Sequence, residues 1–213
     1  AARESTLTAF YTPPAVIRAV YQELERIGIT SGEILEPSCG IGTFLGLCPE
    51  SMQNCHFSGV ELDSISGRIA QQLYPQSAIQ VNGFEKTHFQ DNAFVAAVGN
   101  VPFGDFSVYD AAYDSHHFLI HDYFFAKTLD KVCPGGIVAL ITSKGTMDKE
   151  NASVRQYLAE RAELLGAIRL PNTTFKYAAG TEVTSDILFL RKRTEPMTEQ
   201  PEWGQLKPDA NGS

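Results

Sequence analysis

Two stretches of the chain carry residues that could do chemistry, and the first spans residues 34–45. It reads ILEPSCGIGTFL, in which β-favouring apolar residues lead to Glu36 and a tight turn lies between Gly40 and Gly42. Glycine has no Cβ, so a ligand can lie close to the main chain there. A loop that binds a dinucleotide pyrophosphate would carry a third glycine where this chain has Leu45. The acidic residue before the turn therefore favours a ligand with a positive group, and an ordinary strand-to-helix turn is the alternative.

The second stretch follows an apolar run at residues 93–98 and reads GNVPFG. The side-chain oxygen of Asn100 and the main-chain carbonyl of Val101 could each accept one hydrogen of a planar NH2 group. Pro102 favours an extended conformation at the residue before it, and the ring of Phe103 could stack on a flat substrate. Such acceptors orient a weakly nucleophilic amine and stabilise the charge that develops on it. A turn that merely ends a strand is the alternative, because Asn, Pro and Gly are common turn residues.

Alternating helix and strand patterns must position these two stretches. The pattern predicts a first amphipathic helix from Pro13 to about Gly28, with Thr12 as its cap, and Asp63 as the cap of a second. We expect strands near residues 34–36, 57–62, 78–81, 93–98, 137–142, 165–170 and 183–190, and further helices over 63–73, 116–132 and 152–162.

This alternation indicates an α/β fold with a doubly wound, mostly parallel seven-stranded sheet. The last strand is predicted to run antiparallel, because the loop before it contains Gly180 and no helix. Ligands of such sheets bind at the carboxyl ends of the strands, so Glu36, Glu61 and Asn100 should lie along one edge. Glu61 also lies about 20 positions beyond the glycine turn, where an acidic side chain can accept hydrogen bonds from ribose hydroxyls.

The two stretches resemble motifs of one enzyme family. The segment EPSCGIGTFL resembles the first motif of S-adenosylmethionine-dependent methyltransferases, and of the amino-DNA methyltransferases in particular. The segment NVPF resembles their N-P-P-[YF] motif, with Val101 in place of the first proline, and FYTPPAVI resembles the motif that precedes the glycine loop. This order matches the gamma class of N6-adenine DNA methyltransferases. GNVPFG is also similar to the methylase portion of large helicase-methylase proteins of bacterial mobile elements.

The resemblance implies a Rossmann-like methyltransferase fold, S-adenosylmethionine as cofactor and a role for each matching residue. The cofactor carries an ammonium and a sulfonium, which suits the acidic residue before the glycine turn. Methyl transfer to the N6 amine of a DNA adenine would be catalysed at Asn100, Val101, Pro102 and Phe103, with Phe103 and Phe175 binding a base flipped out of the duplex. The predicted cofactor contacts are Phe10, Thr12, Glu36, Pro37, Ser38, Cys39, Gly40, Gly42, Glu61, Leu62, Phe84 and Asn100. The segment around Phe84 matches the family only in part, so the group that binds the amino edge of the cofactor's adenine stays open.

Composition limits the partners that the chain could hold by itself. The chain has 213 residues and a formal net charge of −8, and its only run of basic residues is at 191–193. A surface that grips duplex DNA usually carries a basic patch. We therefore expect a separate recognition domain or subunit to hold the DNA, and the resemblance allows a helicase domain in the parent chain.

Cysteine and histidine usage gives no sign of a metal site. The four cysteines include no C-x-x-C pair, and Cys48 and Cys133 precede a proline rather than follow it, which argues against the Pro-Cys nucleophile of cytosine-C5 enzymes. His116, His117 and His121 lack companion ligands, so hydrogen bonding at the surface or in a loop is the expected role and no metal is predicted.

We expect a catalytic domain over residues 1–193, its first 30 residues contacting the cofactor, and a polar linker or tail over 194–213. The sequence shows no signal peptide or membrane span, which predicts a cytoplasmic location. The resemblance implies a bacterial protein whose gene could lie on a mobile element. Two other functions stay open. The same amine-binding motif serves methyltransferases that act on a glutamine side chain or an RNA base amine, and the fold could also be a non-catalytic platform that binds S-adenosylmethionine for a helicase partner.

Overall fold

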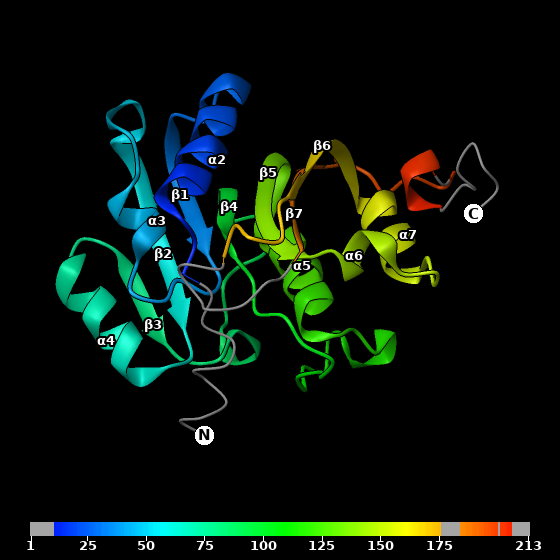
Figure 1. The fold of residues 1–213 in the computed structure, drawn as a ribbon, viewed down its shortest axis with the longest axis horizontal. Helices are drawn as coiled ribbons and strands as arrows, with labels where there is room; N and C mark the ends of the chain where they lie inside the picture. Colours follow the sequence, from blue (N-terminus) through cyan, green and yellow to red (C-terminus); the bar gives the residue numbers. More distant parts are fainter. Residues whose placement is uncertain (1–10, 176–183, 200, 206–213) are drawn as a thin grey trace.

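The computed structural model describes residues 11–175, 184–199 and 201–205, which form a three-layer α/β/α structure (Figure 1). Its seven-stranded sheet has the order β3-β2-β1-β4-β5-β7-β6. The strands are β1 (Ser31–Glu36), β2 (Asn54–Glu61), β3 (Ala78–Val81), β4 (Phe94–Asn100), β5 (Val132–Ser143), β6 (Ala162–Leu170) and β7 (Ser185–Lys192). The α-helices are α2 (Pro14–Ile27), α3 (Thr43–Gly46), α4 (Ser64–Leu73), α5 (Ile120–Lys131), α6 (Gly145–Asp148) and α7 (Ser153–Arg161), and short 3-10 helices are η1 (Glu50–Met52), η2 (Phe84–Lys86), η3 (Asp114–His116) and η4 (Glu202–Gly204).

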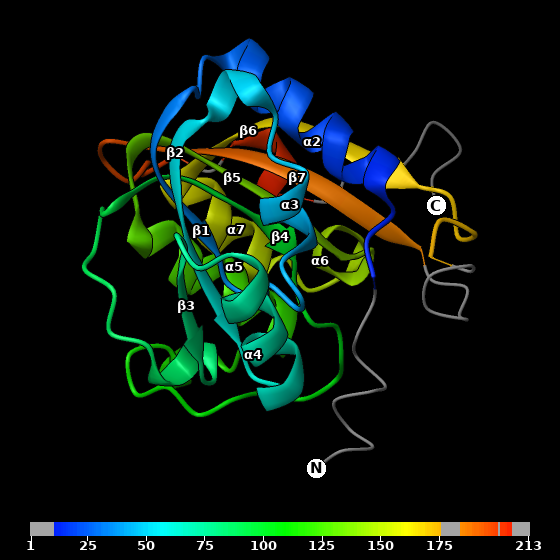
Figure 2. The ribbon, with the colours of Figure 1, turned by 90° about the vertical axis from the view of Figure 1, so that its left-hand side faces the viewer.

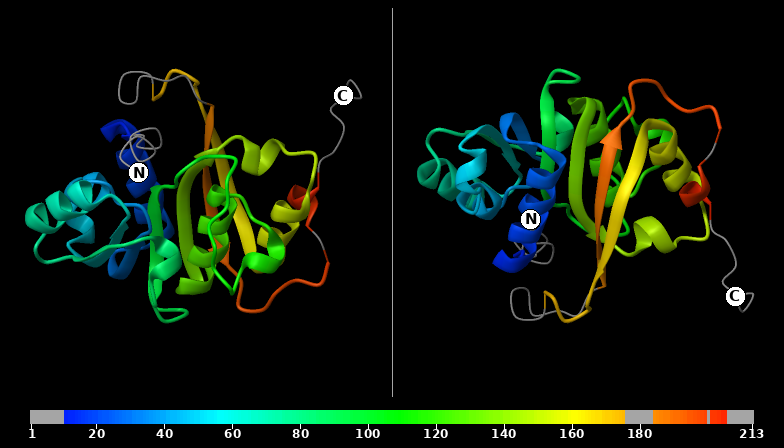
Figure 3. Two further views of the ribbon diagram at one scale, coloured as in Figure 1. Left: turned by 90° about the horizontal axis from the view of Figure 1, so that it is seen from below. Right: turned by 90° about the horizontal axis from the view of Figure 1, so that it is seen from above.

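The two faces of the sheet are covered by different helices (Figures 2 and 3). Neighbouring residues of β1 illustrate this, because Ile34 belongs to the core beneath α2 and α3 while Leu35 belongs to the core beneath α5 and α7. Strand β4 is buried along both faces, as expected for the centre of a largely parallel sheet. Both cores are therefore built from the same strands by alternation of side chains.

The predicted topology is confirmed. Strands β1, β2, β3, β4 and β5 pair in parallel, and β7 runs antiparallel to both of its neighbours, β5 and β6. The chain is thus of the Rossmann-like methyltransferase type. Among the described residues, no helix is long and apolar enough to cross a membrane.

Some predicted boundaries were wrong. Helix α5 begins at Ile120 rather than at residue 116, because η3 precedes it and His117 adopts the left-handed conformation (φ 51°), which separates the two helical segments. Strand β5 begins early because Val132 pairs with Phe94 before a shift in register. Thr12 is not the cap of α2; the cap position is Pro13, without a side-chain hydrogen bond.

Candidate cofactor and catalytic site

Three predicted site residues end three adjacent strands. Glu36 is the last residue of β1, Glu61 of β2 and Asn100 of β4, and β1 lies between the other two strands. Because these strands are parallel, all three residues lie at the same edge of the sheet, where ligands of such folds bind. The predicted arrangement of these residues is therefore confirmed.

The turn after β1 depends on glycine at two positions. Gly40 (φ 56°) and Gly42 (φ 85°) both adopt backbone conformations that L side chains rarely take. A Cβ at Gly40 would meet no atom within 4 Å, whereas one at Gly42 would lie 2.4 Å from the ring of Tyr74. Gly42 therefore allows close packing within the protein, and Gly40 leaves its main chain accessible to a ligand.

Glu61, at the end of the neighbouring strand β2, forms a hydrogen bond to this turn. Its Oε2 accepts a hydrogen bond from the Gly40 amide at 2.7 Å, and its Oε1 accepts one from the Asp63 amide at 2.7 Å. Asp63 caps α4 as predicted, by accepting a hydrogen bond from the Ser66 amide at 2.8 Å. Burial raises the pKa of Glu61, and the bonds from Asp63 and Gly40 lower it. A carboxylate can accept further hydrogen bonds, so Glu61 could also accept one from a ribose hydroxyl. This contact stays a prediction.

Glu36 is a buried carboxyl group of a different kind. It is 2% exposed, and its Oε2 has no hydrogen-bond partner among the described residues. Burial raises its pKa well above the ordinary value, and the nearby Glu61 raises it further. A buried charge is stable only when it is paired. Glu36 forms no ion pair with the described residues, which fits a ligand that brings its own positive charge, such as the ammonium group of S-adenosylmethionine.

The turn after β4 is tied to the glycine turn and to β5. Ser38 Oγ donates a hydrogen bond to the main-chain oxygen of Asn100 at 2.7 Å, and the Val101 amide donates one to the carbonyl of Ile141 at 3.0 Å. Val101 is buried, and the half-buried Phe103 packs against both hydrophobic cores. The NVPF segment is therefore held beside the glycine turn by the Ser38 side chain and beside β5 by a main-chain hydrogen bond.

The remaining predicted residues fall into two groups. Near the edge, Leu62 is 71% exposed, while Thr12, Pro37 and Cys39 are buried. Phe10 lies outside the described residues. Two aromatic side chains are in the cores instead of at an open surface, since Phe84 is 2% exposed and packs on Tyr123 and Phe124, and Phe175 is fully buried. Stacking of these two rings on a cofactor or substrate base stays a prediction, and their packing does not favour it.

The sequence interpretation missed a buried polar cluster beside this site. Asp122 of α5 is 1% exposed; it accepts a hydrogen bond from Lys149 Nζ at 2.7 Å, and its other oxygen lies 3.5 Å from His121 Nε2. His121 is 3% exposed, so the expected surface role was wrong for this residue; burial lowers its pKa. No group of three potential ligands that could hold a metal ion occurs in the part of the chain that the structure describes. The signal available in the sequence was the presence of charged residues in a helix otherwise rich in aromatic and aliphatic ones.

Comparison with known proteins agrees with this geometry. The family model described as N-6 DNA Methylase matches residues 1–202. The chain belongs to the N-6 DNA methylase family. Within that family, the strand-end carboxylates, the glycine turn and the NVPF segment are the candidate site.

Relatives of this N-6 DNA methylase domain include phage and virus proteins. Defense against restriction protein B of Escherichia phage P1 is 33% identical over 92% of this chain and 9% of its own length. Modification methylase CviBIII of Paramecium bursaria Chlorella virus NC1A is 29% identical over 47% of this chain and 27% of its own length.

Solved structures share the fold. A protein from Vibrio vulnificus described as a modification subunit of a type I restriction enzyme aligns with a TM-score of 0.69 and 21% identity, over 89% of this chain and 45% of its own. The chain thus spans less than half the length of each of these relatives.

Proposed function

We propose that this chain transfers a methyl group from S-adenosylmethionine to the exocyclic N6 amine of adenine in DNA. The observation that carries the proposal is the hydrogen bond from Ser38 Oγ to the main-chain oxygen of Asn100, at 2.7 Å. This bond joins the turn suited to a cationic cofactor to the turn suited to a planar amine. The family of the chain supports the choice of adenine N6 and of DNA.

The glycine-turn side of the edge would bind the cofactor. Glu36 would pair with its ammonium group, Glu61 would accept a hydrogen bond from its ribose, and exposed Leu62 would pack on its adenine. Gly40 fits this interpretation because its main chain borders open space. When bound, S-adenosylmethionine would supply an electrophilic methyl group and would retain the C–S electron pair on its sulfur.

The NVPF side of the edge would position the target amine. This amine is a poor nucleophile because its lone pair is delocalised into the ring. The Asn100 side-chain oxygen and the Val101 carbonyl would each accept one amino hydrogen, which orients the lone pair and stabilises the positive charge that develops on nitrogen. Phe103 would stack on the flipped base. The amine's surplus proton leaves to water after the N–C bond has formed.

DNA would be held largely by another domain or subunit. The chain carries a net charge of −8, which disfavours strong binding to a polyanion by this domain alone. The relatives extend far beyond the matched region, which leaves room for a recognition unit or a helicase in the parent protein. A cytoplasmic location in a bacterium, with the gene on a mobile element, agrees with a phage relative.

Isotope transfer tests the proposal directly. The protein is incubated with methyl-labelled S-adenosylmethionine and a mixture of unmethylated DNA, RNA and cell extract, and nucleosides and peptides are then analysed by mass spectrometry. We expect labelled N6-methyladenine in DNA, reduced by about 10²- to 10³-fold in Asn100→Ala at saturating cofactor. Asn54→Ala, at an exposed position at the start of β2, is the matched control and should leave the rate unchanged.

The other outcomes separate the alternatives. Label in RNA or in a glutamine side chain would move the substrate to one of those amines. No label with intact cofactor binding, both here and in the full-length parent protein, would indicate a non-catalytic platform. No detectable cofactor binding would reject all of these functions.

A further inference from the structure

The segment between the NVPF turn and α5 folds into a closed loop over the outer surface of that helix. Its base is closed by a hydrogen bond from the Ile120 amide to the Phe106 carbonyl, at 2.8 Å. Its middle is fixed by Asp110, which accepts a bond from Tyr123 at 2.8 Å and pairs with Lys127 at 3.0 Å. Residues 106–120 therefore form a compact loop tied to α5 at its base and middle, the kind of loop that often carries function.

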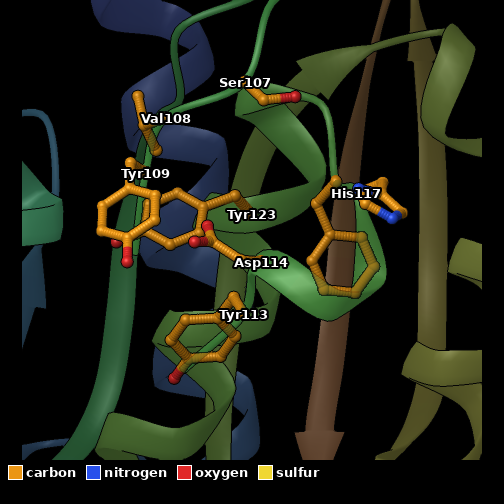
Figure 4. Close-up of a pocket in the computed structure, with 8 residues that line it drawn as sticks. Ser107, Val108, Tyr109, Tyr113, Asp114, His117 and Tyr123 are labelled. Carbon is orange, nitrogen blue, oxygen red and sulfur yellow. The ribbon is translucent and has the colours of Figure 1, made fainter. Parts of the chain in front are cut away.

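The two arms of this loop enclose a cavity of about 430 Å³ (Figure 4). Val108 and Tyr109 come from the part of the loop that leads away from the NVPF turn, and Asp114 and His117 come from the part that leads back to α5. Tyr123 of α5 lies between them. Tyr123 is almost fully buried, whereas Tyr109 is 80% exposed and stands at the rim. Tyr123 therefore forms a buried side of the cavity, and Tyr109 forms a side that is open to solvent.

The charge of the lining points to a cationic ligand. Among the eight described residues that line the cavity, none is Lys or Arg, and Asp114 is the acidic one. Rings of Tyr109, Tyr113, Phe118 and Tyr123 also border it. Aromatic faces carry negative electrostatic potential and attract cations, most strongly where water is excluded. A phosphate or nucleic-acid backbone would meet no opposite charge here.

We propose that this cavity binds an arginine side chain presented by a partner protein. A guanidinium group is planar, so it can stack on a tyrosine ring while its donors reach the Asp114 carboxylate. The cavity is large enough for the side chain and part of the flanking main chain. The net charge of −8 favours a basic partner segment over an acidic one.

Backbone geometry agrees with a pre-formed site. His117 has a φ of 51°, which is uncommon for a residue other than glycine, and it places this side chain at the cavity. Hydrogen bonds from Tyr123 and Lys127 to Asp110 fix one side of the loop on α5, and the Asp110 amide bonds Asp114 across the loop. Less ordering of the protein would therefore be required on binding.

Fluorescence anisotropy with a labelled Gly-Ser-Arg-Arg-Ser-Gly peptide tests the proposal, with a citrulline twin that keeps the shape and removes the charge. We expect the citrulline peptide to bind at least about tenfold more weakly. Tyr109→Ala and Asp114→Asn should each weaken binding of the arginine peptide to a similar degree. Asp114→Asn keeps an acceptor for the Asp110 amide, and Tyr109 is exposed, so neither change should disturb the fold.

Two control variants complete the design. Phe106→Ala removes an exposed ring of the same loop that does not line the cavity, and Asp91→Asn removes an exposed acid elsewhere; both should bind the peptide as the unmodified protein does. Equal binding of the citrulline twin, no effect of either cavity variant, or no binding at millimolar peptide would overturn the proposal. A single-stranded oligonucleotide that displaces the peptide and requires Tyr109 would also overturn it, by assigning the cavity to nucleobases.

Discussion

Glu36 and Asp122 are both buried carboxyl groups near the same edge of the sheet, yet their surroundings differ. Asp122 receives a hydrogen bond from Lys149 at 2.7 Å, while Glu36 Oε2 has no hydrogen-bond partner among the described residues and faces the like charge of Glu61. The protein thus neutralises one buried acid internally. In the proposed function, the other pairs with a cation that arrives with the cofactor, so burial alone would not distinguish a structural acid from a binding acid.

The largest expected effect is on the stability of the protein and concerns the buried pair of Asp122 and Lys149. Lys149→Ala should lower the free energy of unfolding by about 3–5 kcal/mol, because it leaves the Asp122 carboxylate, which is 1% exposed, without its cationic partner. Urea denaturation measures this change. Asp91→Ala, which breaks an exposed pair with Lys131, is the control and should cost less than about 1 kcal/mol. Equal costs for the two variants would contradict the structural role of Asp122.

Substitution of Glu36 should instead change the affinity for the cofactor and leave the stability of the protein unchanged. Glu36→Gln should weaken S-adenosylmethionine binding by about 1.5–3 kcal/mol, the range for a hydrogen bond to a charged group, without lowering stability. Isothermal titration calorimetry measures the affinity, and Glu33→Gln, at an exposed position of the same strand, is the control. Unchanged affinity in Glu36→Gln would remove this residue from the cofactor site.

The pH dependence of the free energy of unfolding should also reflect the buried state of Glu36. Since the pKa of Glu36 is raised in the folded state, the folded protein keeps a proton that the unfolded chain releases above the ordinary carboxyl pKa. The contribution of Glu36 to stability is thus fully present below that ordinary value and falls as pH rises through the raised pKa, by at most about 1.4 kcal/mol per pH unit. Thermal unfolding of the unmodified protein and of Glu36→Gln should therefore diverge as the pH rises. Parallel curves would mean that Glu36 is not protonated in the free protein.

The smallest expected effect concerns the link between the two turns. Ser38→Ala removes the hydrogen bond to the Asn100 main chain and should cost about 0.5–1.5 kcal/mol of stability. If the link positions the NVPF turn, the methylation rate should fall more than cofactor affinity does. Ser64→Ala, at an exposed position of α4, is the control. A loss of cofactor affinity alone would place the role of Ser38 in binding.

The features predicted well from the sequence are those set by short-range patterns. Glu36, Glu61 and Asn100 each follow an apolar strand, so their common edge follows from parallel pairing. The cap at Asp63 and the left-handed glycines likewise depend on a few adjacent residues.

The features that were missed depend on contacts between distant segments. Phe84 was predicted to contact the cofactor, but α5 packs over its ring and Lys127 donates a hydrogen bond to its carbonyl. The pair of Asp122 and Lys149 joins residues 27 positions apart, and nothing in the local sequence of either residue indicates the other. Packing of this kind decides which aromatic and charged groups remain available to a ligand.

The position of β7 has a consequence for the order in which the molecule can assemble. Strand β5 is buried on both faces and pairs with β7, so that Ile137 meets Arg191 about fifty residues later in the chain. Until β7 has been synthesised, β5 is an apolar edge strand with unpaired main-chain groups, a state prone to aggregation. Strands β1, β2 and β3 instead pair across only about twenty residues, as Leu35 does with Ser58 and Ser58 does with Ala78. In pulse-labelling hydrogen exchange, amides of β1 and β2 should therefore become protected before those of β7, and simultaneous protection would show that the sheet closes in a single step.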